Sequence, residues 1–327
     1  MQNSNPDLIV SRVPATWGSL LVLIGFVLIG MAVGNILAVM ILALYFSTDA
    51  ESVTVLLNQL ITNPGKVKNG WYALMVLQGV VHFFSYLLPS LLYWFYIERR
   101  KISQLSPGRT PAAQVWLLAF LLVLIFIPIN SKFIEWNAAM KLPDALSGLE
   151  TWMRDKEDQL SVMTAFLTSY KSFGQLLIAL FVVTLLPALG EEALFRGVIQ
   201  TKLTQQFTNP HVAIWVSAAI FSAIHFQFYG FLPRMMLGAL FGYLYFWTGN
   251  FWVAVLAHFV NNGFVLVMMY LHNIGIIKTN IEETKSMSGV LVISSLFLTI
   301  LVLNFIRQAS LPRKQAIRGD QQLVIKI

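Results

Sequence analysis

The sequence predicts an all-α fold, a polytopic membrane bundle of about eight transmembrane helices. Of its 327 residues, 57% are hydrophobic and only 11% are charged, whereas soluble domains carry roughly a quarter charged residues. The apolar residues form long continuous runs, unlike the alternating pattern typical of a membrane β-barrel. Several runs reach the roughly 20 residues that a helix needs to cross a bilayer.

Eight apolar segments are long enough to be interpreted as spanning helices. They are 17–46, 71–97, 112–130, 173–189 continuing into 190–206, 210–226, 231–248, 250–272 and 288–306. The first is too long for a cleavable signal peptide and is interpreted as an anchor helix. The fourth is unusually long, and we expect Pro187 and Gly190 to kink it.

Two polar segments interrupt these runs. Residues 47–70 form a short loop, and residues 131–172 hold six acidic residues together with Trp136 and Trp152. Because tryptophan favours membrane interfaces, the longer segment is interpreted as interfacial helices, with a plain solvated loop as the alternative. The chain then divides into N-terminal helices (1–172), a core (173–272), and a last helix with a basic tail (273–327).

The net charge is +7, and the cations flank apolar runs. Cations in such positions set the orientation of a protein in the membrane, so no nucleic-acid partner is expected. These cations are Arg99, Arg100, Lys101, Arg109, Arg307, Arg313, Lys314 and Arg318. The excess of cations in cytoplasmic segments places both termini in the cytoplasm, and we expect an integral protein of the bacterial inner membrane. The chain has no cysteine, which excludes disulfides, thiolate metal sites and cysteine nucleophiles.

The stretch GEEALFRG, residues 190–197, places three charges in a strongly apolar part of the chain. Ionisable groups inside a membrane are costly, so each is a candidate functional residue. Glu192 and Arg196 are four residues apart on one helical face, and we expect an ion pair. Glu191 lies about 100° around the helix and has no partner at helical spacing. Glu191 is therefore available for chemistry, unless both carboxylates serve to neutralise Arg196.

Two later segments carry polar residues on apolar helices. FSAIHFQF contains His225, and LAHFVNNGF contains His258 and Asn262, which are four residues apart on one face. Taken singly, these residues are also typical of packed polar groups or of hydrogen bonds between helices. Counting roughly 1.5 Å per residue along successive helices brings all three to about the depth of Glu191. We therefore predict one polar site.

The predicted site has the parts of an amide hydrolase. A carboxylate can take a proton from water while a nearby imidazole orients that water. A second histidine and an amide N–H can hold the oxyanion that forms when water attacks a peptide carbonyl. Two histidines and a carboxylate could equally bind zinc, although the sequence has no HExxH motif. No cofactor is certain, and a divalent metal such as zinc stays open beside glutamate-activated water.

Three short motifs together resemble those of the CPBP family of intramembrane metalloproteases, the type II CAAX prenyl endopeptidase-like or Abi family. They are EEALFR at 191–196, FSAIH at 221–225 and HFVNN at 258–262, and the resemblance covers roughly 173–272. It implies an eight-helix membrane peptidase fold. It implies that Glu191 activates water with His225, that His258 and Asn262 stabilise the oxyanion, and that Glu192 and Arg196 support the site.

The substrate that this resemblance implies is a membrane-associated peptide or protein, prenylated or otherwise hydrophobic, which meets the enzyme in the lipid bilayer. One rival function is a noncatalytic membrane scaffold or bacteriocin-immunity factor. A second is a transporter, which the absence of a paired half-chain repeat disfavours. Of the remaining residues, we expect Gly238 and Gly242 to allow close helix packing and His82 to be a packed polar group. Arg234 is expected to snorkel to the interface, with neutralisation of a substrate carboxylate as the alternative.

Overall fold

The computed structural model describes residues 17–46, 50–108, 110–207, 209–278 and 287–310. Most of these residues are helical, and no strand occurs among them, which confirms the all-α prediction. Arg109, Arg313, Lys314 and Arg318, on which the predicted orientation partly rests, lie outside the described residues.

The α-helices are α1 (Trp17–Phe46), α2 (Ala50–Thr62), α3 (Gly70–His82), α4 (Leu88–Leu92), α5 (Ala113–Ala138), α6 (Ser147–Thr168), α7 (Phe173–Ala179), α8 (Leu186–Glu192), α9 (Thr201–Gln206), α10 (Pro210–Ala223), α11 (Phe231–Thr248), α12 (Phe251–Asn273) and α13 (Gly289–Ser310). Wider π-helical segments at Phe83–Leu87, Tyr93–Ile97, Leu180–Leu185 and Ala193–Gln200 join some of them into longer rods. Short 3₁₀ turns lie at Pro64–Lys66, Ile102–Leu105, Asp144–Leu146 and Phe228–Gly230.

Six rods in the described chain are long and apolar enough to cross a membrane. They are Trp17–Phe46, Gly70–Ile97, Ala113–Ala138, Phe173–Gln206, Phe251–Asn273 and Gly289–Ser310. The predicted count of eight is not confirmed. The other two predicted spans do form helices, but α10 has only 14 residues. The 18 residues of α11 include a proline, two glycines and Arg234, which lower its hydropathy.

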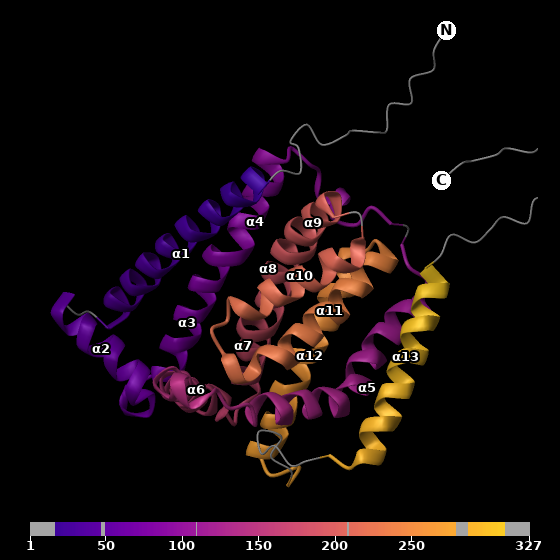
Figure 1. The fold of residues 1–327 in the computed structure, drawn as a ribbon. Coiled ribbons are helices and arrows are strands. Elements are labelled where there is room, and N and C mark those ends of the chain that lie inside the picture. Colours follow the sequence, from indigo (N-terminus) through magenta and orange to yellow (C-terminus); the bar gives the residue numbers. More distant parts are fainter. Residues whose placement is uncertain (1–16, 47–49, 109, 208, 279–286, 311–327) are drawn as a thin grey trace, which may run out of the picture.

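The spans are arranged as one bundle. Figure 1 shows α1 and α3 on one side, α5 and α13 on the opposite side, and α8, α10, α11 and α12 between them. The elements α2 and α6 lie at one end of the bundle, and α9 lies at the other. The largest group of buried apolar side chains spans these middle helices and α5. Residues 131–172 are largely helical, so the loop alternative is wrong. Residues 131–138 continue α5, and an interfacial position for α6 stays a prediction.

The fourth span departs from regular α-helix around the residues that were expected to kink it. Its short α8 segment carries Pro187 in its first turn and lies between two π-helical segments, Leu180–Leu185 and Ala193–Gln200. Proline removes one helical hydrogen bond, so a wider turn before it is physically reasonable. A Cβ atom on Gly190 would lie 3.1 Å from the backbone nitrogen of Leu87. Glycine therefore allows the fourth span to approach the second closely.

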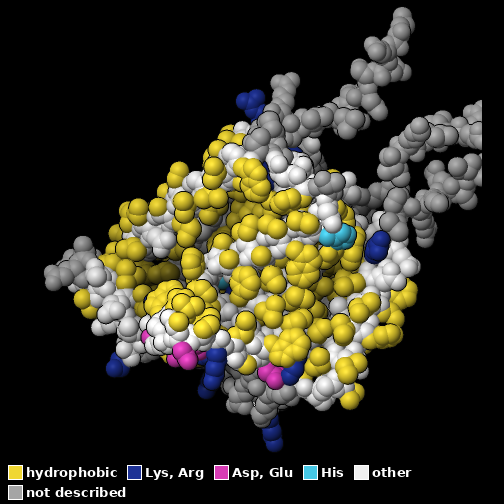
Figure 2. All heavy atoms as spheres, viewed as in Figure 1, with side chains coloured by type: hydrophobic (Ala, Val, Ile, Leu, Met, Phe, Trp, Pro, Cys, Tyr) yellow, Lys and Arg dark blue, Asp and Glu magenta, His cyan; other side chains and the backbone are white. Residues whose placement is uncertain are grey.

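The outer surface is apolar around the middle of the bundle. Large apolar side chains are exposed on the flanking helices, including Ile29 of α1 at 66% and Phe297 of α13 at 65%. Figure 2 shows apolar side chains over most of one face, with the carboxylates gathered near the end that carries α6. Such an extensive apolar surface would be unfavourable in water and suits contact with lipid. This surface agrees with an all-α membrane bundle.

Candidate active site

The two adjacent carboxylates at the end of α8 point in different directions. Glu192 is fully buried, and its Oε1 lies 2.9 Å from the guanidinium of Arg196 one turn later, so the expected ion pair is present. Glu191 is 6% exposed and faces α3 and α12. The angular offset between neighbouring helical residues separates the two groups.

Glu192 also binds a residue of α12. Its Oε1 accepts a hydrogen bond of 2.8 Å from Nδ1 of His258. The second guanidinium nitrogen of Arg196 donates to the backbone carbonyl of Gly238 at 2.6 Å. The ring of Phe241 stacks on the imidazole of His258, with centroids 5.3 Å apart. Glu192 and Arg196 thus join α8, α11 and α12 and hold His258 in one orientation.

Two imidazoles approach the carboxylate of Glu191. Nε2 of His258 lies 3.8 Å from Oε2, and Nε2 of His82 lies 3.8 Å from Oε1. These separations exceed a direct hydrogen bond, so the three groups are neighbours without being bonded to one another. A cavity of about 520 Å³ adjoins them, and its walls include all three side chains. The carboxylate is therefore accessible to a small molecule within a largely buried site.

His225 reaches the same cavity from the turn after α10. Helix α10 ends at Ala223, three residues before the predicted end of this span at 226, and Phe226 adopts a positive φ of 52° in the turn. The Nδ1 atom of His225 lies 2.8 Å from the carbonyl oxygen of Phe221. A carbonyl only accepts hydrogen bonds, so Nδ1 must carry the proton. In the neutral ring, Nε2 is then an acceptor.

Asn262 lies one turn after His258 on α12 and also lines the cavity. Its side-chain oxygen accepts a hydrogen bond of 3.0 Å from the amide of Asn261. This bond leaves the amide nitrogen of Asn262 as the group that can donate to a ligand. The four predicted catalytic residues, Glu191, His225, His258 and Asn262, thus share one cavity, and Glu192 and Arg196 are packed behind it.

His82 was expected to be only a packed polar group, and that interpretation is incomplete. Its ring does stack on Tyr86, with centroids 4.5 Å apart, but it also faces Glu191 and lines the cavity. Gln78, one helical turn before His82, and Tyr86, one turn after it, line the cavity as well. A polar stripe at four-residue spacing along an apolar helix is a sequence signal that could have revealed this face.

Arg234 was expected to snorkel to the membrane interface, with neutralisation of a substrate carboxylate as the alternative, and the structure places it in the wall of the cavity. Its side chain lines the same cavity, and one guanidinium nitrogen donates to the side-chain oxygen of Gln227. Its other terminal nitrogen is buried without a hydrogen-bond partner in the described structure. The reason is local: the Phe228–Gly230 turn folds against the first turn of α11, and Gly230 leaves room for the guanidinium.

The described residues contain no group of three or more histidine, aspartate and glutamate side chains placed to hold a metal ion. The three cavity histidines come from different segments, and the bond from Nδ1 of His258 to Glu192 leaves its Nε2 on the side of Glu191. Water activation by zinc and by glutamate are therefore kept as separate hypotheses, and the chemistry below uses the side chains alone.

One protein family matches the part of the chain that supplies most of this cavity's lining. Residues 173–264 match the family described as type II CAAX prenyl endopeptidase Rce1-like. This segment is similar to that family. The Rce1-like segment contains the three motifs and their four cavity residues, which confirms the resemblance found in the sequence. His82 lies outside it, so the second span adds a wall to the Rce1-like cavity.

Two relatives from Bacillus subtilis (strain 168) resemble the chain. The "Uncharacterized protein YpbD" is 39% identical over 82 residues, which are 24% of this chain and 39% of the relative. The "Putative membrane peptidase YdiL" is 33% identical over 108 residues, which are 33% of this chain and 42% of the relative. The chain thus matches about two-fifths of each relative's length. No solved structure matches the chain.

Proposed function

We propose that the chain is an intramembrane endopeptidase that hydrolyses a peptide bond through water activated by Glu191. The observation that carries this proposal is the carboxylate of Glu191, which shares a cavity with three histidines and an asparagine amide. The Rce1-like match of residues 173–264 supports the same class of reaction.

Glu191 acts as the general base. A water molecule donates one hydrogen bond to the carboxylate and one to Nε2 of His225, the acceptor nitrogen of that ring. The water oxygen attacks the peptide carbonyl as its proton passes to Glu191. The same proton then moves from Glu191 to the departing amide nitrogen, so the C–N bond breaks and Glu191 returns to its carboxylate form. No covalent bond to the protein forms.

His258 and Asn262 stabilise the oxyanion. Glu192 accepts the Nδ1 hydrogen of His258 and thereby aims Nε2 toward the cavity. When Nε2 also carries a proton, it donates to the developing negative charge, together with the amide nitrogen of Asn262. Because these donors are fixed by the packing of α8 and α12, little reorganisation is needed during the reaction.

The substrate is a membrane-associated peptide or protein with a prenylated or otherwise hydrophobic segment. The cavity lies within an apolar bundle and has Ile134, Val183 and Leu237 in its walls. An apolar segment would enter such a site from the lipid without first being transferred to water. The polar groups inside would bind the peptide bond itself.

The test compares wild type with Glu191→Ala on a library of membrane-anchored peptides. Glu135→Ala, which removes a glutamate from the far part of α5, is the matched control. We expect Glu191→Ala to lose about a thousandfold in cleavage rate while retaining its helical fold, and the control to cleave normally. Full cleavage by Glu191→Ala would refute the mechanism. Absence of cleavage in wild type, with retained binding of a partner, would favour the scaffold function.

The zinc alternative makes a different prediction. With glutamate-activated water, exhaustive treatment with a chelator leaves the cleavage rate unchanged, and purified protein contains far less than one metal ion per chain. Loss of cleavage on chelation, restored by stoichiometric zinc, would instead support a metal-activated water.

A further inference from the structure

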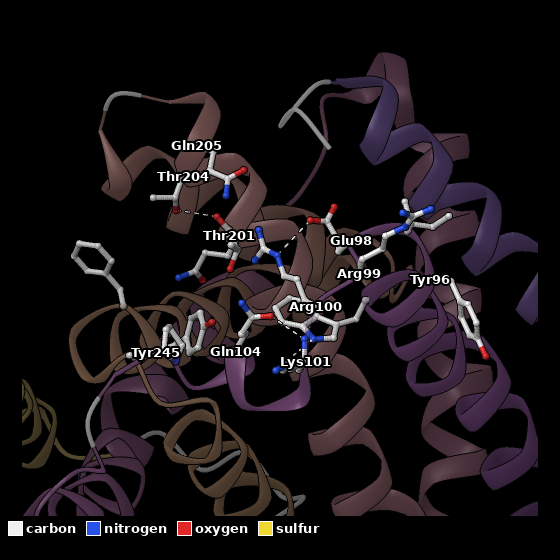
Figure 3. A pocket seen from close by; sticks show the side chains of 16 residues that line it. Tyr96, Glu98, Arg99, Arg100, Lys101, Gln104, Thr201, Thr204, Gln205 and Tyr245 are labelled. Carbon is white, nitrogen blue, oxygen red and sulfur yellow. Dashed lines mark hydrogen bonds and ion pairs between the residues drawn. The ribbon is translucent and has the colours of Figure 1, made fainter. Parts of the chain in front are cut away.

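A second and larger cavity lies away from the site of Glu191. It has a volume of about 1330 Å³, and its walls come from the end of the second span, the following loop, α9 and the end of α11. Figure 3 shows the guanidinium of Arg100 near its centre, between Glu98 and Thr201, with Gln104 and Tyr245 on another wall. None of the residues discussed above as catalytic lines this cavity.

The walls of this cavity carry a surplus of positive charge. Arg99, Arg100 and Lys101 follow one another in its lining, and Glu98 is the one carboxylate among the described residues that line it. Glu98 is itself engaged: Lys202, 4% exposed, lies 2.5 Å from its Oε1, and Arg100 lies 3.4 Å from its Oε2. Glu98 therefore cannot neutralise Arg99 and Lys101 in addition.

The cationic loop is held in place by the end of the second span. The indole nitrogen of Trp94 donates to the carbonyl of Lys101 at 3.0 Å, and the guanidinium of Arg100 lies 5.1 Å from the centre of the Trp94 ring. The backbone nitrogen of Arg100 also donates to the carbonyl of Trp94 at 3.1 Å. The positive groups are thus set on an ordered loop and not on a freely moving one.

The position of the cavity matches the level of lipid headgroups. The second span ends at Ile97 and the fourth at Gln206, and the lining residues 98–101 and 200–205 lie at these ends. Trp94, Tyr96 and Tyr245 add aromatic rings, which are favoured at membrane interfaces. Hydroxyl and amide groups of Thr204 and Gln205 complete a polar wall.

The loop that supplies the cations also borders an apolar crevice. Ile102 and Leu105, beside Lys101 and Gln104 in sequence, line a separate space of about 160 Å³ together with Leu91 and Trp252. A ligand with an anionic group and an apolar chain would find both chemistries along one loop. A free inorganic anion would bind only the cationic groups and would leave the apolar crevice empty.

We propose that the large cavity binds the phosphate group of an anionic phospholipid, with Arg99 and Lys101 as its principal cationic contacts. The basic loop draws in the phosphate, and the neighbouring apolar crevice accepts part of an acyl chain. Positively charged pockets at the ends of spanning helices bind such headgroups by charge attraction and hydrogen bonding. The inference is independent of the proposed peptidase reaction, since the two cavities share no lining residue.

The experiment measures lipid retained by the full chain in native mass spectrometry after exposure to equal amounts of POPG and POPC. Wild type is compared with the double variant Arg99→Gln, Lys101→Gln. The matched control is Lys66→Gln, Lys68→Gln, which removes the same charge near the start of the same span. We expect wild type and control to retain POPG in preference to POPC, and the double variant to bind POPG about ten- to thirtyfold more weakly.

A second variant tests the proposal independently, in case the double variant does not fold. Gln205→Glu adds a negative charge to the cavity wall at nearly constant size, and it should also weaken POPG binding. Gel filtration and thermal unfolding establish that each variant is folded. Equal POPG binding by wild type and both variants, or no preference for POPG over POPC in wild type, would overturn the proposal.

Inorganic phosphate forms the third arm and distinguishes the source of the anionic group. If millimolar phosphate displaces POPG and raises the melting temperature as much as POPG does, the phosphate chemistry stands and the natural ligand is a free phosphate. If POPG binds and phosphate does not compete, the acyl chain contributes and the ligand is the lipid.

Discussion

The Nδ1 atom of His258 lies 2.8 Å from Oε1 of Glu192, although 66 positions separate the two residues in sequence. The same oxygen lies 2.9 Å from Arg196. One carboxylate oxygen therefore both neutralises a buried cation and orients an imidazole whose other nitrogen lies 3.8 Å from Glu191. The two adjacent glutamates have distinct environments, and their substitution should have distinct effects.

Glu192→Gln should destabilise the fold far more than Glu191→Gln. The first change leaves the buried guanidinium of Arg196 without its carboxylate, which costs about 3–5 kcal/mol in comparable buried pairs. Glu191 has no such pair at hydrogen-bonding distance, so its amide variant should lose activity and little stability. Thermal unfolding in detergent measures the difference. Equal losses of stability would contradict the separate roles.

His82→Phe should lower the rate of peptide cleavage about tenfold without unfolding the protein. Phenylalanine can keep the stacking on Tyr86, but it removes the Nε2 atom that faces Glu191. We expect this nitrogen to help order the attacking water beside Glu191 and His225, and that contribution would be lost. Phe83→Leu, at the next and more exposed position, is the control. An unchanged rate for His82→Phe would show that His82 serves packing alone.

Gly242→Ala should destabilise the bundle by about 1–3 kcal/mol. An added Cβ would lie 2.8 Å from the side-chain oxygen of Gln200 and 2.9 Å from a methyl group of Ile214, so either these side chains or α11 would have to shift. Gly174→Ala is the matched control, because a Cβ there meets nothing within 4 Å. Denaturation of the two variants under the same conditions checks the prediction. A Gly242→Ala protein as stable as the control would refute the close packing.

Acidification should break the hydrogen bond that holds the backbone of Leu142, in the loop before α6, to Glu150. The pKa of Glu150 lies below its ordinary value because Arg154 donates hydrogen bonds to its carboxylate, and the backbone of Leu142 donates another. A lowered folded-state pKa gives stability above the ordinary carboxylate pKa of about 4.3 and loses it as the pH falls through the lowered value. Amide exchange at Leu142 should show protection at pH 7 that disappears at low pH. In Glu150→Gln this protection should be weaker and independent of pH.

The absence of native cysteine allows a direct test of orientation. Lys101→Cys and Lys68→Cys place one thiol at each end of the second span. Because cations are favoured in cytoplasmic segments, Lys101→Cys should resist a membrane-impermeant thiol reagent added to intact cells, whereas Lys68→Cys should react. The opposite pattern would reverse the predicted topology.

Local periodicity was sufficient to predict several features. Continuous apolar runs predicted the six helical rods of the described chain that are long enough to cross a membrane. A four-residue spacing predicted the ion pair of Glu192 and Arg196. Counting helical rise correctly suggested that Glu191, His225 and His258 would share one cavity. These features depend on the hydrogen-bonded geometry of single helices and hairpins, which nearby residues determine.

Packing between helices decided the rest. The sequence by itself determined that Glu191 and Glu192 would face different ways, but not that Glu192 would hold His258 or that His82 would face Glu191. It likewise determined the basic run after the second span, but not the large cavity into which that run folds beside α9 and α11. Such contacts depend on how π-helical turns and glycines set the approach of whole helices, and residues distant in sequence jointly determine that approach.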